Sequence, residues 1–346
     1  MKVHYKRFTA LAALTLSASM ALTACGGGDD TETGTDGGGG GDITLTMLPK
    51  NLGNPYFDTS TAGAEEAAEE LGASLEEVGP EQASPDAQVQ YINTAAQQGV
   101  NGLIISANDP TAICDAIEEA RSAEVKVVTF DSDTGPDCRD LFVNQATAEG
   151  IAAKQLELIA EQIGGSGEIA ILSASANATN QNAWIEMMEA ELESNPDYAE
   201  IELVDTVYGD DDDQKSFDQT EALLSNHPNL KGIISPTTVG IAAAARYLSE
   251  SEFKGKVALT GLGTPNQMRP YVEDGTVEAF ALWNPADLGY LATHAAAALA
   301  AGDITGEEGD TFTAGRLGEY TVEADGVVVL GEPFAFTADN IADFDF

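Results

Sequence analysis

The sequence predicts an α/β protein with two doubly wound lobes, each built on a parallel sheet. Short β-branched runs alternate with alanine-rich, helix-length segments from Asp42 onward, which is typical of βαβ units with right-handed crossovers. The alternation runs once to 142–144 and then restarts. This restart favours two similar lobes over one eight-fold barrel, the alternative fold. About 300 residues of such sequence also exceed the usual size of a single domain.

Each expected strand is a short run rich in Val, Ile, Leu or Thr, bounded by Gly, Pro, Asn or Asp. The expected strands are Ile43–Leu48, Ser74–Glu77, Gly102–Ser106, Lys126–Asp131, Glu168–Ser173, Glu202–Val207, Gly232–Ile234, Val257–Thr260 and Glu278–Leu282. The segments between them are rich in good helix formers. The expected helices include Thr59–Leu71, Ala87–Gln98, Thr111–Ala123, Thr147–Ile163, Asn182–Glu193, Ser216–Asn226 and Val239–Ser249.

The N-terminus has the pattern of an export signal. Three basic residues (Lys2, Lys6 and Arg7) precede an apolar run that ends in Leu-Thr-Ala-Cys at residue 25, and a positive start, a short apolar run and small residues are typical of secretory signals. The final cysteine resembles a bacterial lipobox, so we expect a signal peptide over 1–24, a lipid on Cys25 and a glycine-rich tether over 25–41. A plain secretory signal with an accidental cysteine is the alternative, whereas the run is short for a membrane span.

Charge excludes several partners. Loss of residues 1–24 would leave 12 Lys and Arg against 58 Asp and Glu. A surface this acidic repels nucleic acid and anionic lipid. Four acids at Asp210–Asp213 could suggest a metal site, but they precede a helix, where carboxylates cap the N-terminus or stay in a solvated loop. We therefore expect no metal site. We also expect no cofactor and a monomer.

Cys114 and Cys138 form an even pair once Cys25 is lipidated. Disulfides persist outside the cytoplasm, so we expect these two residues to be bonded, with two unpaired cysteines as the alternative. No histidine lies near either residue in sequence, which argues against a catalytic thiol.

Polar residues follow many of the expected strands. In doubly wound sheets ligands bind at the carboxyl ends of strands, so these loops are the candidate site. They are 49–57, 106–110 and 131–133 in the first half, and 177–182, 236–238, 261–264 and 283–285 in the second. Amides, carboxylates and a lysine beside aromatic rings suit a ligand with several hydroxyl groups.

The same loops carry a family resemblance. The stretches are LPKNLGNPYFD, ISANDP, TFDSDTGPDCR, VNQAT, ATNQNAWIEMM, IISPTTVGIAAAA, GLGTPNQMRPYVEDGTV and ALWNPADLGYLA. From residue 42 to 346 the chain resembles sugar-type periplasmic binding proteins of the ribose-binding class, in the branch that holds rhamnose-binding and autoinducer-2-binding proteins.

That resemblance implies the type I periplasmic binding protein fold, in which a three-segment hinge joins two lobes that close on a ligand. The crossings fall near Asn144–Ala146, Trp283–Pro285 and Glu319–Gly326. The lobes would be 42–145 with 285–322, and 146–284 with 323–346. The implied partners are an ABC permease and its ATPase, which recognise the closed form.

The resemblance also implies ligand contacts. Lys50 and Asp131 match first-lobe positions that hold autoinducer-2 in its receptors, and the matching second-lobe positions are Asn180, Gln181, Pro236 and Thr238. Those receptors carry Asp where this chain has Asn180, and Ala where it has Thr238. Both departures favour rhamnose or a similar deoxysugar. DSDTGPDCR, MRPYVEDGTV and the cysteine pair favour autoinducer-2, and Leu262-Gly263 argues against ribose.

Other loop residues have competing interpretations. Asn51, Asn54 and Asn108 are candidate ligand contacts, although Asn54 and Asn108 lie close to prolines and could form turns. Asn180 and Gln181 could instead cap a helix. Phe57 and Trp283 are candidates that could also be core or hinge residues, and Tyr56 is a weaker one.

An enzyme is the contrasting class of function. The sequence has no P-loop, no G-x-S-x-G motif, no paired histidines and no GxGxxG after the first strand. We therefore expect a binding protein. A receptor that presents its ligand to a membrane sensor would use the same binding chemistry.

Overall fold

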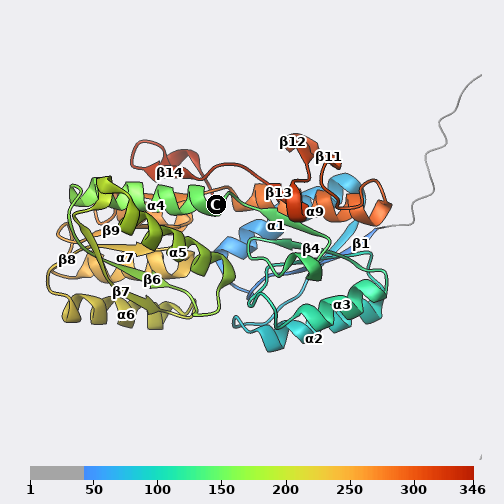
Figure 1. The fold of residues 1–346 in the computed structure, drawn as a ribbon, viewed down its shortest axis with the longest axis horizontal. Helices are drawn as coiled ribbons and strands as arrows, with labels where there is room; N and C mark the ends of the chain where they lie inside the picture. Colours follow the sequence, from blue (N-terminus) through green and yellow to red (C-terminus); the bar gives the residue numbers. More distant parts are fainter. Residues whose placement is uncertain (1–42) are drawn as a thin grey trace, which may run out of the picture. The chain divides into compact units, whose positions relative to one another are not determined.

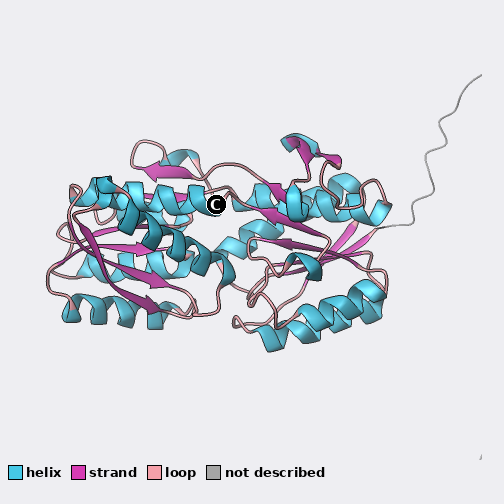
Figure 2. Cartoon of the chain, viewed as in Figure 1, coloured by secondary structure: helices cyan, strands magenta, loops and turns pink. Residues whose placement is uncertain are grey.

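The computed structural model describes residues 43–346, which form two α/β lobes (Figures 1 and 2). The predicted signal peptide, the predicted tether and Cys25 lie outside the described residues. Within residues 43–346 no helix has both the length and the apolar character that a membrane crossing requires.

The first lobe contains a six-stranded parallel sheet with the order β13-β5-β4-β3-β1-β2. Its strands are β1 (Thr44–Leu48), β2 (Ser74–Glu77), β3 (Gly102–Ile105), β4 (Lys126–Phe130), β5 (Leu141–Asn144) and β13 (Val327–Val329). Helices α1 (Pro55–Leu71) and α9 (Pro285–Ala301) cover one face, and α2 (Pro85–Gln98) and α3 (Cys114–Ser122) cover the other (Figure 1). Successive residues of β3 face opposite sides of the sheet. Ile104 packs in the hydrophobic core under α1 and α9, and Ile105 packs in the core under α2 and α3.

The second lobe contains a four-stranded parallel sheet with the order β7-β6-β8-β9. Its strands are β6 (Gly167–Ser173), β7 (Ile201–Tyr208), β8 (Leu230–Ser235) and β9 (Ala258–Gly261), and β10 (Ala279–Leu282) adjoins β9 and pairs antiparallel with β14 (Phe334–Thr337). Its helices are α4 (Ala148–Ile163), α5 (Thr179–Ser194), α6 (Asp213–Asn226), α7 (Thr238–Glu250) and α8 (Pro265–Glu273). Helices lie on both sides of this sheet (Figure 2), so both lobes are doubly wound.

The chain passes between the lobes three times, from β5 to α4, from β10 to α9 and from β13 to β14. The third crossing lies between Val329 and Phe334. It does not lie near Glu319–Gly326, so assigning all of 323–346 to the second lobe is wrong. The physical reason is that Val327–Val329 pairs in parallel with Phe142–Asn144 and extends the first sheet by one edge strand.

Several helices begin earlier than the sequence patterns indicate. Helix α1 begins at Pro55 rather than Thr59, because Asn54 acts as its N-cap and accepts a hydrogen bond from the backbone N–H of Tyr56. Proline fits the first position of a helix, where no intrahelical partner exists for its missing N–H. The C-terminal strands, including the hairpin β11 (Thr311–Ala314) and β12 (Gly318–Thr321), were not among the expected elements.

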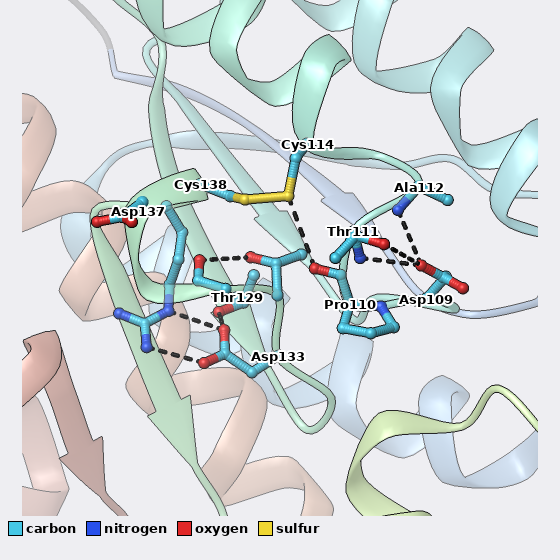
Figure 3. The surroundings of a disulfide bond; sticks show 12 residues. Asp109, Pro110, Thr111, Ala112, Cys114, Thr129, Asp133, Asp137 and Cys138 are labelled. Carbon is cyan, nitrogen blue, oxygen red and sulfur yellow. Dashed lines mark hydrogen bonds and ion pairs between the residues drawn. A yellow bond between two sulfur atoms is a disulfide. The ribbon is translucent and has the colours of Figure 1, made fainter.

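A disulfide joins Cys114, at the start of α3, to Cys138, in a short turn after β4 (Figure 3). The next residue, Arg139, donates from Nε and Nη2 to the two carboxylate oxygens of Asp133, at 2.8 Å each, and from Nη1 to the carbonyl of Asp325 at 2.8 Å. The loop that follows β4 is therefore held by the disulfide and by the Arg139–Asp133 ion pair, and a hydrogen bond from Arg139 connects it to the segment before β13.

Stability is expected to fall in mild acid because of His294 on α9. His294 is 5% exposed, and its ring lies 4.6 Å from the Tyr290 ring, measured between centroids. Burial lowers the pKa of His294, against the opposing charge of Glu70. The unfolded chain therefore binds a proton at His294 more readily than the folded protein does. Above about pH 6.5 neither form binds this proton and stability is unaffected, whereas below it the free energy of unfolding decreases. Urea unfolding between about pH 7.5 and 5.5 should show this.

The matched control for this pH effect is His294→Leu, which has no titrating ring. As the pH falls, the free energy of unfolding should decrease more for wild type than for His294→Leu. A pH-independent difference would contradict the assignment to His294.

Candidate functional site

A pocket lies at the carboxyl ends of the strands, where residues of both lobes meet. It has about 370 Å³ of empty space, counting the part open to solvent. The lining residues are Lys50, Asn54, Tyr56, Phe57, Asp131, Asn180, Gln181, Trp184, Asp211, Pro236, Thr237, Thr238, Leu262, Leu282 and Trp283. Nine of the eleven predicted contact residues are brought together here; Asn51 and Asn108 are not.

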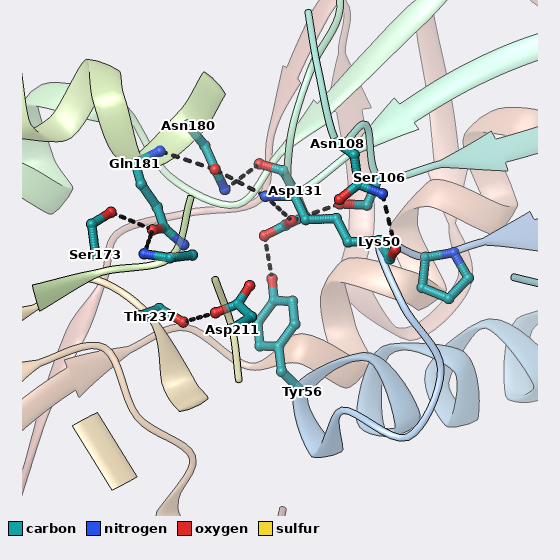
Figure 4. A network of polar contacts seen from close by, with 12 residues as sticks. Lys50, Tyr56, Ser106, Asn108, Asp131, Ser173, Asn180, Gln181, Asp211 and Thr237 are labelled. Carbon is teal, nitrogen blue, oxygen red and sulfur yellow. Dashed lines mark hydrogen bonds and ion pairs between the residues drawn. The ribbon is translucent and has the colours of Figure 1, made fainter. Parts of the chain in front are cut away.

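Asp131 is the centre of the polar network on the first-lobe side (Figure 4). It follows β4 with a φ of 60°, a left-handed conformation that Asp tolerates better than most residues. Its carboxylate accepts hydrogen bonds from the hydroxyls of Tyr56 at 3.0 Å and Ser106 at 2.7 Å, and lies 3.8 Å from Lys50 Nζ. Asp131 and Lys50 are each 5% exposed. A buried pair of opposite charge requires such additional hydrogen bonds.

Aromatic side chains form the wall beside this ion pair. The Tyr56 hydroxyl accepts a hydrogen bond from Nε1 of Trp283 at 3.0 Å while it donates to Asp131. Burial and the Asp131 charge raise the pKa of Tyr56 well above its usual value, so the phenol keeps the proton that it donates. Trp184 packs edge-on against Trp283, and Phe57 packs edge-on against Tyr56. These rings can cover the C–H faces of a sugar.

The second-lobe side contributes amides at the start of α5. Gln181 Oε1 accepts from the Ser173 hydroxyl at 2.7 Å and from the Ala174 N–H at 2.8 Å, which fixes the amide at the end of β6. Asn180 Oδ1 accepts from Lys50 Nζ at 3.1 Å, so a first-lobe cation and a second-lobe amide are in direct contact. The N-cap position of α5 is occupied by Ala178, so neither amide serves as the N-cap.

Asn51 and Asn108 do not line the pocket. Asn108 Nδ2 donates to the carbonyl of Lys50 at 2.9 Å, and its backbone N–H donates to Gln88 Oε1 at 3.0 Å. Asn108 lines a small neighbouring hollow rather than the main pocket. These bonds give Asn108 a role in positioning the Lys50 loop.

Asp211 is a pocket residue that the sequence patterns did not indicate. It belongs to the acidic run expected to cap a helix or remain solvated, and its three neighbours behave in that way. Asp212 caps α6 by accepting from the Lys215 N–H at 2.7 Å, Asp210 pairs with Lys215, and Asp213 pairs with Arg246. Asp211 instead lines the pocket. The usable signal was its position in the loop after the strand β7, three residues beyond Tyr208.

Other pocket residues were also missed. Tyr56 was considered only as a weaker candidate. Thr237 and Leu262 lie in loops expected to form the site, 236–238 and 261–264, but were not named as ligand contacts. Trp184 and Leu282 were not singled out, because their sequence patterns are those of ordinary helix and core residues. Among residues 43–346 no three metal-ligating side chains are grouped to hold an ion.

Residues 45–304 match the periplasmic binding protein domain. The chain belongs to this family. The periplasmic binding protein fold expected from the sequence, with two doubly wound lobes and a three-segment hinge, is confirmed, as is the resemblance to the ribose-binding class. Members of the family bind solutes for transport and do not transform them, so the chain is not an enzyme, and the family implies an exported location.

Three solved periplasmic binding proteins are similar to this chain, and each alignment covers 88% of it. A sugar ABC transporter protein from Actinomyces odontolyticus is 56% identical over 98% of its own length, with a TM-score of 0.73. A solute-binding protein from Clostridium phytofermentas with bound L-rhamnose is 39% identical over 98%, with a TM-score of 0.84. LsrB from Clostridium saccharobutylicum in complex with AI-2 is 27% identical over 100%, also with a TM-score of 0.84.

A curated relative is more distant. The ribose import binding protein RbsB of Bacillus subtilis is 25% identical over 260 residues, which cover 74% of this chain and 81% of the relative. With the solved structures, this relative places the chain among the sugar-binding components of ABC transporters.

Proposed function

We propose that this protein captures a small sugar, rhamnose or a similar deoxysugar, by closure of its two lobes, and delivers it to an ABC permease and its ATPase. The observation that carries the proposal is the pocket shared by both lobes, in which the buried Lys50–Asp131 pair faces Asn180. Charged and amide groups beside aromatic rings match the hydroxyls and C–H faces of a sugar. The 39% identity to a protein with bound L-rhamnose supports this ligand.

A protein that binds autoinducer-2 for signal uptake is the second candidate. It is supported by the similarity to LsrB in complex with AI-2, with a TM-score of 0.84, and by the motifs DSDTGPDCR and MRPYVEDGTV with the Cys114–Cys138 pair. In either case the protein would work as a monomer. Delivery of the same sugar to a membrane sensor would use the same site.

We also propose that Cys25 carries a lipid that holds the mature protein on the outer face of the cell membrane, with residues 26–41 as the tether. Cys25→Ser should then release the exported protein from membranes into the soluble fraction. If the variant stays on the membrane as fully as wild type, the lipid proposal is wrong.

A melting screen tests the ligand. The chain without residues 1–24, with Cys25→Ser to prevent lipidation, would be melted with L-rhamnose, other deoxysugars, pentoses and autoinducer-2. A ligand at one hundred times its dissociation constant adds about 2.7 kcal/mol to the free energy of unfolding, which is a clear shift in Tm. A shift with rhamnose supports the deoxysugar proposal, a shift only with autoinducer-2 supports the second candidate, and a shift only with a pentose contradicts both.

The double variant Asn180→Asp, Thr238→Ala is expected to bind autoinducer-2 more tightly relative to rhamnose, by roughly tenfold or more in the ratio of dissociation constants. Both residues line the pocket, and the new carboxylate would still accept from Lys50. The measurement is a titration of both ligands against wild type and variant. An unchanged ratio of the two dissociation constants would mean that Asn180 and Thr238 do not determine the choice between the two ligands.

A further inference from the structure

Asp211 is a pocket carboxylate to which the sequence-based interpretation assigned no role in ligand binding. Its side chain accepts one hydrogen bond, from the hydroxyl of Thr237, as Figure 4 shows. Within residues 43–346 no basic side chain forms an ion pair with it, in contrast to Asp210 and Asp213. A carboxylate offers about four acceptor sites, so most of the acceptor capacity of Asp211 remains open toward the pocket.

The backbone around Asp211 fixes where this carboxylate lies. The N–H of Gly209 donates to the carbonyl of Ser173 at 2.8 Å, and that of Asp210 donates to the carbonyl of Ala174 at 2.7 Å. Gln181 is held by the same two residues, Ser173 and Ala174. The turn then runs through two left-handed residues, Asp210 with a φ of 55° and Asp211 with a φ of 51°. Asp211 and Gln181 are thus fixed to the same end of β6.

Neighbouring groups act on the Asp211 carboxylate in opposite directions. Burial raises the pKa of Asp211, and the like charges of Asp131 and Asp210 raise it further, while Thr237 and Lys50 oppose this shift. A carboxylate that is desolvated and has few partners gains most from new donors, because burial of an unpaired charge is costly. Sugar hydroxyls are such donors.

We propose that Asp211 is a ligand-binding and specificity-determining residue, the second-lobe carboxylate that accepts hydrogen bonds from hydroxyl groups of the bound sugar. The inference rests on the proposed function of the pocket. With Asp131 in the first lobe and Asp211 in the second, a sugar meets a carboxylate acceptor on each side. A ligand shifts the lobes toward closure only by its preference for the closed form, so Asp211 favours sugars with a free hydroxyl directed at the second lobe.

The test compares Asp211→Asn with the matched control Asp213→Asn. Both variants lose the same charge from the same turn, but Asp213 is exposed and pairs with Arg246 outside the pocket. Asn tolerates the left-handed backbone at position 211. Binding of L-rhamnose would be followed by tryptophan fluorescence, since the two tryptophans of the chain, Trp184 and Trp283, both line the pocket.

We expect Asp211→Asn to weaken L-rhamnose binding roughly tenfold to a hundredfold, as for the loss of a charged hydrogen bond, and Asp213→Asn to change it by less than about twofold. Rhamnose analogues that each lack one hydroxyl distinguish a direct contact between Asp211 and the sugar from a purely structural role of Asp211. One analogue should bind wild type much more weakly than rhamnose does, and this penalty should largely vanish in Asp211→Asn.

Equal affinities of wild type and Asp211→Asn, or the same analogue penalties in both, would overturn the proposal. If the Asn variant does not fold, Asp211→Gly removes the carboxylate at a φ that glycine adopts freely. If wild type does not bind rhamnose, the deoxysugar proposal fails by itself, and the tightest sugar of the melting panel with its deoxygenated analogues replaces rhamnose in the same comparison. Failure of wild type to bind any sugar overturns both proposals.

Discussion

Asp131→Asn is expected to weaken sugar binding by at least about a hundredfold, the effect of removing a charged acceptor and leaving a buried cation unpaired. The carboxylate holds the Tyr56 and Ser106 hydroxyls and lies 3.8 Å from Lys50 Nζ. An amide can keep one of these hydrogen bonds but provides no charge opposite the buried lysine. Asn also accepts the left-handed backbone at this position, where φ is 60°, so the change tests the charge rather than the turn.

Isothermal titration of wild type, Asp131→Asn and Asp115→Asn would measure this effect. Asp115 is an exposed first-lobe residue in the first turn of α3, so its variant carries the same loss of charge outside the site. Near-wild-type affinity in Asp131→Asn would mean that the carboxylate serves only the turn after β4. Because the hydroxyl partners of Asp131 are buried, we also expect a lower Tm without ligand.

Gly63→Ala is expected to lower the free energy of unfolding by about 3 kcal/mol or more, because it forces apart two helices in backbone contact. A Cβ at residue 63 on α1 would lie 1.9 Å from the carbonyl oxygen of Ala286 on α9. The contact is reciprocal, since a Cβ at Gly289 would lie 1.8 Å from the carbonyl oxygen of Ser60. Neither partner is a flexible side chain, so the helices themselves would have to move.

Urea unfolding of Gly63→Ala beside Gly331→Ala would measure the cost. A Cβ at Gly331 would meet no atom within 4 Å, so the control should stay near wild type. Equal stability of the two variants would contradict the close approach of α1 and α9. Ala286 lies just after the second crossing between the lobes, so Gly63→Ala should also alter ligand affinity.

The alternation of β-branched and alanine-rich segments was sufficient to predict both lobes, since βαβ periodicity depends only on local sequence. The position of the site followed from the same pattern, because polar residues at the carboxyl ends of parallel strands meet at one edge. What the sequence could not resolve depends on long-range contacts. Three valines at 327–329 form an edge strand only because β5 lies beside them.

The miss at Asp211 has a different cause. Four consecutive aspartates look equivalent in sequence, and three of them do cap or pair at the surface. Two left-handed residues in the turn direct the remaining carboxylate inward, and nothing in the sequence of the run predicts that conformation. Asn108 shows a similar limit, because its side chain donates to the carbonyl of Lys50, a long-range contact that no local pattern indicates.

The order of the last strands has a consequence for how the protein matures. Residue 144 pairs with residue 329 in the first sheet, and residue 282 pairs with residue 334 in the second lobe. Neither lobe can therefore be completed until residues 327–337 have left the ribosome. Contacts so distant along the chain form slowly. Until these residues are made each lobe lacks one of its strands, which suits the exported location that the family implies.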